Sequence, residues 1–221
     1  MNAHASATHA VESFLKERLI CVAVIDDARD AAPLADALLT GGLSVIEVTF
    51  RTANAAESIA AIRKHVPGMT VGAGTLLSAE QVKRAVDVGA QFGVSPGLNE
   101  PVLAAATAAG LPFFPGVMTP TEVDRALQLN HRHLKFFPAE AAGGVAMLKA
   151  LAGPFAHTGV KFIPTGGINA ANLFAYLVLP QVAAIGGSWM AERQMVVEKA
   201  WQKIAAMTAN AMKIIAQAKS G

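Results

Sequence analysis

The fold of this chain can be inferred from one stretch, SVIEVTFRTANAAESIAAIRKHVPGMTVGAGT (44–75). Its first residues are rich in β-branched side chains, as in a β-strand. An Ala-rich amphipathic stretch at 54–65 predicts a helix, and a second β-rich segment follows at 70–75. A strand, a helix and another strand in this order indicate a parallel sheet covered by helices.

The same alternation of strand and helix continues along the rest of the chain. The expected strands are 21–25, 44–50, 70–75, 92–96, 111–117, 133–138, 161–167 and 183–188. The expected helices lie near 31–40, 54–65, 78–88, 99–109, 119–129, 144–151, 169–177 and 191–219. The expected N-caps include Asn54, Ser78, Asn99 and Asn169.

Eight strands separated by helices are compatible with a closed (β/α)8 barrel or with an open doubly wound sheet. No GxGxxG follows the first expected strand, and no Walker sequence occurs. Eight similar units without a long insertion favour closure. We therefore expect an α/β fold, a single (β/α)8 TIM barrel with an N-terminal helix near 11–18 and a C-terminal helix. This domain should cover residues 11–221 after a frayed N-terminus at 1–10.

Composition argues against several classes of protein. Hydrophobic residues make up 53% of the 221 residues and charged residues 15%, against roughly 25% charged in typical domains. The apolar runs are short and broken by Gly, Pro or charge, so we expect no membrane span. A net charge of +2 without a basic block argues against nucleic acid as the main partner. With one cysteine, Cys21, and no secretory signal, we expect a cytoplasmic protein without a disulfide framework.

Two charged side chains fall at positions that should face the barrel interior. Alternation along SVIEVTFRT puts Glu47 inside and Arg51 at the mouth, with the intervening apolar residues facing the helices. The same parity in HLKFFP puts Lys135 inside. Barrel interiors normally hold branched apolar side chains, so both residues need an explanation.

Two explanations of Glu47 and Lys135 remain open at this point. The pair could simply fill the barrel as a buried ion pair, which is weak evidence for stability. Alternatively, the apolar neighbours of Lys135 disfavour its ammonium form, and a neutral lysine can attack a ketone to form an iminium. Glu47 would then transfer protons.

Other polar residues at strand ends are candidate ligand-binding groups. Arg51 offers a fork of donors suited to a carboxylate. Thr75 ends GAGT, whose two glycines would let a ligand approach the backbone. A solvated arginine and a threonine with a local hydrogen bond are equally compatible with these positions, and Thr165 shares that ambiguity.

Glycine pairs follow the last two expected strands. PTGGI (164–168) and IGGS (185–188) place Gly166, Gly167, Gly186, Gly187 and Ser188 at these strand ends. Many barrels bind phosphate there through backbone N–H groups and the start of a short helix. Each pair alone could be a tight turn, but together they predict a phosphorylated ligand whose other end reaches Lys135. His131 and His133 have no carboxylates at ligand spacing, so we expect no metal site.

Eight segments, quoted in chain order, resemble one known enzyme family. They are VIEVTFRT (45–52), GAGTLL (72–77), SPGLNEP (95–101), FFPG (113–116), KFFPAEAAGG (135–144), GPF (153–155), FIPTGGI (162–168) and IGGSW (185–189). The likeness runs from about Leu19 to Trp189. The segments look like 2-keto-3-deoxy-6-phosphogluconate (KDPG) aldolase, a family also described as 4-hydroxy-2-oxoglutarate aldolase.

The resemblance implies a class I aldolase, which is a (β/α)8 barrel, usually a homotrimer, and needs no metal or other cofactor. It implies that Lys135 forms the Schiff base and that Glu47 is the acid/base. Arg51 and Thr75 match the residues that hold the pyruvyl carboxylate. The other expected substrate-binding residues are Pro96, Phe137, Thr165, Gly166, Gly167, Gly187 and Ser188, with Gly166, Gly167 and Ser188 at the phosphate end. Ala142 departs from the Asn of some members, which would affect substrate preference rather than chemistry.

The resemblance therefore implies a lyase of the Entner–Doudoroff pathway that cleaves KDPG to pyruvate and glyceraldehyde 3-phosphate. It should also cleave 4-hydroxy-2-oxoglutarate to pyruvate and glyoxylate. Three alternatives remain: an aldolase for the galactonate epimer, a phosphate-barrel isomerase or synthase, and a non-catalytic phosphosugar-binding barrel. The set of Glu47, Arg51 and Lys135 argues against the last two, whereas the fold alone decides nothing.

Overall fold

The structure is a computed structural model that describes residues 15–220. The segment expected to be frayed, 1–10, lies outside the described residues, as does the first part of the helix expected at 11–18. Residues 15–17 of that helix are helical. None of the helices within 15–220 is long and apolar enough to cross a membrane.

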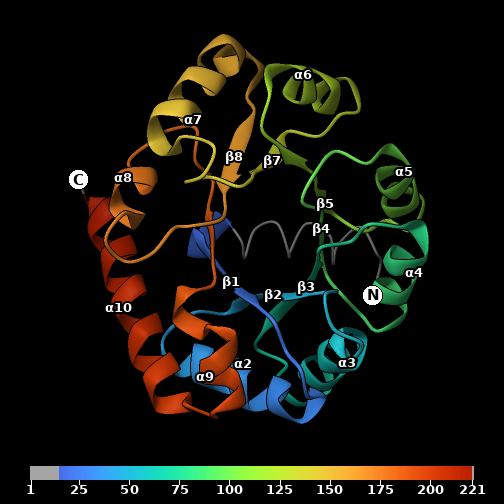
Figure 1. Cartoon of the computed structure of the whole chain (residues 1–221), viewed down its shortest axis with the longest axis vertical. Helices are drawn as coiled ribbons and strands as arrows, with labels where there is room; N and C mark the ends of the chain where they lie inside the picture. Colours follow the sequence, from blue (N-terminus) through green and yellow to red (C-terminus); the bar gives the residue numbers. More distant parts are fainter. Residues whose placement is uncertain (1–14, 221) are drawn as a thin grey trace.

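The strands form a curled parallel sheet at the centre of the molecule, and helices surround it (Figure 1). The strands are β1 (Leu19–Ala23), β2 (Val45–Thr49), β3 (Thr70–Gly74), β4 (Gly93–Val94), β5 (Phe113–Phe114), β6 (Gly116–Val117), β7 (His133–Phe136), β8 (Lys161–Pro164) and β9 (Ile185–Gly187). Six of them pair in the order β5-β4-β3-β2-β1-β9, and three pair in the order β6-β7-β8. Single parallel bridges join Phe162 to Val182 and Thr165 to Gly186. They connect the edge of the three-stranded set at β8 with the edge of the six-stranded set at β9.

Two strand predictions need correction. The strand expected at 111–117 is divided into β5 and β6, with Pro115 between them. Proline has no N–H to donate to a ladder, which accounts for the interruption. The first strand begins at Leu19 rather than at residue 21, because it pairs along its whole first half with β9.

The helices cover the outer face of the sheet. They are η1 (Ala28–Asp30), α2 (Ala31–Thr40), α3 (Ala55–His65), α4 (Ala79–Asp87), α5 (Glu100–Ala108), α6 (Pro120–Gln128), α7 (Gly144–Ala152), η2 (Gly153–Thr158), α8 (Leu173–Leu177), η3 (Trp189–Ala191), α9 (Arg193–Val197) and α10 (Trp201–Ser220). Most lie within a residue or two of the expected ranges. The helix expected at 169–177 begins only at Leu173, and the one expected at 191–219 is divided into η3, α9 and α10. Lys199, with φ +55°, turns the chain between α9 and α10.

The expected N-caps are confirmed in part. The side chains of Ser78 and Asn99 accept hydrogen bonds from Gln81 N and Val102 N, as capping residues do. Asn54 occupies the N-cap position of α3 without a side-chain cap bond, because its amide donates to the Asp26 carbonyl instead. Asn169 is not an N-cap of α8, since its side chain accepts from Ala171 N in the preceding turn.

Alternate residues of the strands face two separate hydrophobic clusters. The larger cluster lies between sheet and helices and includes Ile46, Val48 and Phe136. The smaller one fills the inside of the curled sheet and consists of Ile20, Val45, Phe92, Val94, Phe114, Ile163, Ala183 and Ala184. The inside and outside faces expected for β2 and β7 are therefore confirmed. This alternation also leaves room above the inner cluster, at the carboxyl ends of the strands.

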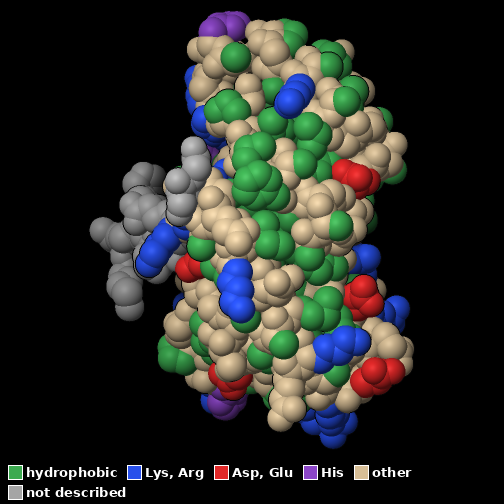
Figure 2. All heavy atoms as spheres, turned by 90° about the vertical axis from the view of Figure 1, so that its left-hand side faces the viewer, with side chains coloured by type: hydrophobic (Ala, Val, Ile, Leu, Met, Phe, Trp, Pro, Cys, Tyr) green, Lys and Arg blue, Asp and Glu red, His purple; other side chains and the backbone are tan. Residues whose placement is uncertain are grey.

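Charged side chains are dispersed over the molecular surface that carries α8 and α10. Figure 2 shows this side, where Lys and Arg side chains are interspersed with Asp and Glu side chains and with hydrophobic ones. The described part of this face therefore presents no basic patch of the kind that tracks a nucleic-acid backbone.

Candidate active site

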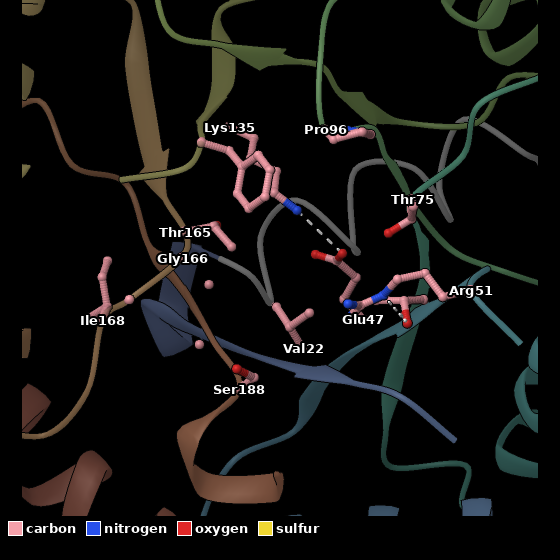
Figure 3. A pocket seen from close by; sticks show the side chains of 15 residues that line it. Val22, Glu47, Arg51, Thr75, Pro96, Lys135, Thr165, Gly166, Ile168 and Ser188 are labelled. Carbon is pink, nitrogen blue, oxygen red and sulfur yellow. Dashed lines mark hydrogen bonds and ion pairs between the residues drawn. The ribbon is translucent and has the colours of Figure 1, made fainter. Parts of the chain in front are cut away.

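A cavity of about 270 Å³ opens where the strands end. We call it the main cavity (Figure 3). Its lining residues are Val22, Glu47, Thr49, Arg51, Thr75, Pro96, Lys135, Phe137, Thr165, Gly166, Gly167, Ile168, Gly186, Gly187 and Ser188. All eleven residues that the sequence predicts as catalytic or substrate-binding are among them. The structure therefore brings together groups from six strand ends.

Lys135 and Glu47 meet inside this cavity. Lys135 Nζ lies 3.5 Å from Glu47 Oε1, and the two side chains are only 7% and 2% exposed. Lys135 Nζ also lies 5.3 Å from the centre of the Phe137 ring. Phe136, which alternation along β7 places on the opposite face, packs outward against the helices. In a pair such as Lys135 and Glu47, the amine can act as a nucleophile, and the carboxylate can accept its proton.

The glycines of GAGT make room for side chains. A Cβ at Gly74 would lie 1.9 Å from Glu47 Oε1, and one at Gly72 would lie 2.2 Å from the Phe92 ring. The expectation that both glycines serve ligand approach is therefore corrected, because protein atoms occupy that space. Gly74 is the residue that lets Glu47 lie flat against β3 and reach Lys135.

One side of the main cavity carries Arg51 and Thr75, as Figure 3 shows. Arg51 Nε donates to Thr49 Oγ1 at 3.2 Å, and Thr49 Oγ1 donates to the Ala23 carbonyl at 3.1 Å. This chain of hydrogen bonds orients the guanidinium from the end of β2 through its Nε. Thr75 has φ +58°, an uncommon conformation for a residue other than glycine. The pair forms a donor-rich wall suited to a carboxylate.

The opposite side of the cavity is formed by the two glycine pairs. Gly166 and Gly167 have φ +101° and +79°, which glycine adopts most readily. The Gly166 carbonyl accepts from Glu140 N at 3.1 Å, so the turn after β8 is fixed to the segment after β7. A Cβ at Gly186 would lie 2.3 Å from Thr165 Oγ1, so this glycine admits the threonine side chain.

Three lining residues were not singled out from the sequence, Val22, Thr49 and Ile168. Alternation along β1 could have found Val22, since Ile20 on the same face belongs to the inner cluster. Ile168 follows Gly167 in a turn, where no periodic pattern applies. Ala142, expected to influence substrate preference, packs against the outer core and does not line the cavity.

Titratable groups near the sheet but outside the cavity behave as ordinary buried groups. Cys21 is fully buried, and burial, together with the charge of Glu47, raises the pKa of its thiol. Burial also lowers the pKa of His131 and of His133. Within residues 15–220, no three His, Cys, Asp or Glu side chains gather where they could hold a metal ion.

Comparison with known proteins agrees with this geometry. The family model described as "Aldolase: KDPG and KHG aldolase" matches residues 11–207. The chain belongs to the KDPG and KHG aldolase family. The chain is similar to "2-dehydro-3-deoxy-phosphogluconate aldolase" of Treponema pallidum (strain Nichols), with 45% identity over 92% of this chain and 96% of that protein.

Two further proteins are similar to this chain over most of its length. "KHG/KDPG aldolase" of Escherichia coli (strain K12) is 48% identical over 78% of this chain and 80% of the E. coli protein. A crystal structure of KDPG aldolase from Legionella pneumophila aligns with a TM-score of 0.86 at 40% identity, covering 90% of this chain and 96% of that one. That structure contains pyruvate captured at low pH as a covalent carbinolamine intermediate.

Proposed function

We propose that this chain is a class I aldolase that cleaves KDPG to pyruvate and glyceraldehyde 3-phosphate and also cleaves 4-hydroxy-2-oxoglutarate. The observation that carries the proposal is the buried pair of Lys135 Nζ and Glu47 Oε1, 3.5 Å apart between two walls suited to anions. A relative at 45% identity named for the KDPG activity and one at 48% identity named for both activities support it.

The reaction begins at the lysine. Neutral Lys135 adds to the C2 ketone of the substrate and forms a carbinolamine. Loss of one water gives an iminium, which is an electron sink at C2. The main cavity is small and enclosed by the strand ends, so the ketone is held beside the amine and the addition is effectively intramolecular.

Glu47 then performs the proton transfers. Its carboxylate, directly or through a water, removes the proton of the C4 hydroxyl. The electron pair of the C3–C4 bond moves into the iminium, giving an enamine on Lys135 and free glyceraldehyde 3-phosphate. The protonated Glu47 returns its proton to C3, and one water hydrolyses the new iminium to pyruvate and free Lys135.

The remaining residues bind and orient the substrate. Arg51 and Thr75 hold the pyruvyl carboxylate, which directs C2 towards Lys135. Gly166, Gly167 and Ser188 hold the phosphate end, and Pro96, Phe137, Thr165 and Gly187 complete the pocket. Binding at both ends fixes the C3–C4 bond between Lys135 and Glu47. No metal ion or other cofactor is required, because the iminium supplies the electron sink.

Borohydride trapping tests the mechanism. Pyruvate and borohydride should leave a reduced pyruvyl adduct on the peptide containing Lys135, with or without a chelator, and Lys135→Ala should lose both the adduct and turnover. The absence of an adduct on any lysine would refute a Schiff-base aldolase. An isomerase, a synthase or a phosphosugar-binding protein would then be the better assignment.

Substrate choice requires a separate comparison. We propose the gluconate epimer as the preferred phosphorylated substrate, since the similar relatives are named for it. Values of kcat/KM on KDPG, on its galactonate epimer and on 4-hydroxy-2-oxoglutarate rank the three. A clear preference for the galactonate epimer would replace the first assignment while leaving the Schiff-base mechanism intact.

We also propose the finer architecture that accompanies this activity. Residues 11–221 form one domain in which the sheet closes into a (β/α)8 barrel, with the Thr165–Gly186 bridge at one seam and Pro115 at the other. Three copies assemble into a homotrimer in the cytoplasm, as the resemblance to the family implies. Light scattering on the purified protein measures the assembly, and a monomer at all concentrations would exclude a trimer.

A further inference from the structure

A second cavity adjoins the proposed active site. It measures about 320 Å³, and Val22, Arg51 and Ser188 line it together with the main cavity. We call it the side cavity. Its other lining residues are Val24, Thr52, Ala191, Glu192 and Arg193. The side cavity therefore extends the site from Ser188 over the end of β1 towards α9, beyond the residues that the proposed mechanism uses.

The distribution of charge in the two cavities is uneven. Among the described residues that line the main cavity, the cations are Arg51 and Lys135, and the proposed mechanism assigns both to the pyruvyl half. The opposite end offers glycine backbone and the Ser188 hydroxyl. A phosphate monoester carries about −1.5 to −2 charges at neutral pH, so hydrogen bonds alone leave most of that charge uncompensated. Among the described residues, Arg51 and Arg193 are the cations that line the side cavity with Ser188, and Arg193 is the one that the proposed mechanism leaves without a role.

In this structure, Arg193 is paired with Asp26 in the segment after β1. Its Nε and Nη2 donate to the two carboxylate oxygens of Asp26, each at 2.7 Å. This bidentate arrangement is also the one in which a guanidinium binds a phosphate. The hydrogen bonds from Arg193 lower the pKa of Asp26, so the carboxylate is charged at neutral pH.

The ion pair is exposed to solvent. The Arg193 and Asp26 side chains are 63% and 36% exposed, and ion pairs in such positions contribute little to stability. Replacing the Asp26 carboxylate by another anion as the partner of Arg193 therefore costs little free energy. A phosphate at Ser188 offers the guanidinium more negative charge than Asp26 does.

We propose that Arg193 is a specificity-determining residue that binds the distal phosphate of the substrate, and that Asp26 competes with this phosphate for its guanidinium. The proposal rests on the proposed function, because it takes the Ser188 end as the phosphate end. Arg193 supplies the missing positive charge when the phosphate is bound. Asp26 holds the same guanidinium otherwise, which weakens phosphate binding and favours product release.

Two substitutions that act in opposite directions test the proposal. The substrates are KDPG and 2-keto-3-deoxygluconate, which is the same molecule without its phosphate. Arg193→Gln should raise KM for KDPG about tenfold, the loss expected for a hydrogen bond to a charged group, and leave KM for 2-keto-3-deoxygluconate unchanged. Asp26→Asn should lower KM for KDPG about twofold to fivefold, the range expected for an exposed ion pair. Arg193→Lys should recover part of the binding.

Arg29→Gln and Asp27→Asn are the matched controls. Arg29 and Asp27 form a similar exposed ion pair in the same segment, but they line neither cavity. Both controls should leave the two KM values unchanged. Inorganic phosphate provides a second readout, since as a competitive inhibitor against KDPG it should bind more weakly to Arg193→Gln and more tightly to Asp26→Asn.

Three results would overturn the proposal: no change of KM in Arg193→Gln, an equal change for both substrates, or the same change in Arg29→Gln. An equal change for both substrates would assign Arg193 a structural role. Failure of the proposed function is distinguishable, because it would appear as the absence of a pyruvate adduct on Lys135 in the unaltered protein.

Discussion

Replacement of Glu47 by Gln separates the two halves of the proposed reaction. Glutamine has nearly the volume of glutamate, so the side chain keeps its place beside Gly74, where a single added Cβ would lie 1.9 Å from Oε1. The change removes the carboxylate that lies 3.5 Å from Lys135 Nζ. The cavity therefore keeps its shape and its amine but loses its proton carrier.

The expected magnitude follows from the role of that carboxylate. A positioned general acid–base contributes typically about 10²- to 10⁴-fold to a rate, or about 3–5.5 kcal/mol of activation free energy at 1.36 kcal/mol per tenfold. Cleavage by Glu47→Gln should fall within that range. Addition of Lys135 to pyruvate should continue, because the amine and the wall of Arg51 and Thr75 are unchanged.

The assay compares two rates on the same protein. Rapid mixing with pyruvate and borohydride gives the rate of adduct formation on Lys135, and coupled reduction of released pyruvate gives steady-state cleavage. Glu47→Asp, which keeps the carboxylate on a shorter side chain, should recover part of the cleavage rate. Unchanged turnover in Glu47→Gln, or an equal fall of adduct formation and turnover, would refute the assignment of Glu47 to proton transfer.

Two further predictions concern carboxylate binding and pH. Arg51→Lys removes the fork of donors, so the pyruvate concentration that gives half-maximal trapping should rise about tenfold. Adducts on Lys135 should still form. An unchanged half-maximal concentration would exclude Arg51 from carboxylate binding. Burial lowers the pKa of His131 and of His133 in the folded state. Folding is therefore most favourable above their unfolded pKa of about 6.5, where both side chains are neutral. This part of the stability is lost as the pH falls through the lowered pKa values of the folded state. Between pH 7 and 5, the melting temperature of a His131→Asn, His133→Asn double variant should fall less than that of the unaltered protein.

Local patterns in the chain were sufficient to predict which residues of the strands face inward and which face the helices. Alternation along residues 44–51 predicts Glu47 inside and Ile46 and Val48 outside, and the structure has these two apolar residues in the outer cluster. Capping by Ser78 and Asn99 was also predictable, because a cap bond spans three residues. Both signals depend only on neighbouring residues.

Other features depended on packing between distant segments. Asn169 has the residue type of an N-cap, but its side chain bonds within a turn, and α8 begins only at Leu173. The last helical stretch is broken at Lys199, although its composition continues without a glycine or proline. Propensity is a weak prior that tertiary context overrides in such places.

The order of the strands and helices, the inward positions of Glu47 and Lys135 and the residues at the strand ends could all be predicted from the amino-acid sequence. Three contacts could be seen only in the folded chain: Lys135 Nζ lies 3.5 Å from Glu47, 88 positions away, Glu47 occupies the space that a Cβ at Gly74 would need, and Asp26 pairs with Arg193. The difference follows from the range of the interactions. Alternation and capping act over a few residues, whereas these contacts depend on how the curled sheet brings separate strand ends to one cavity.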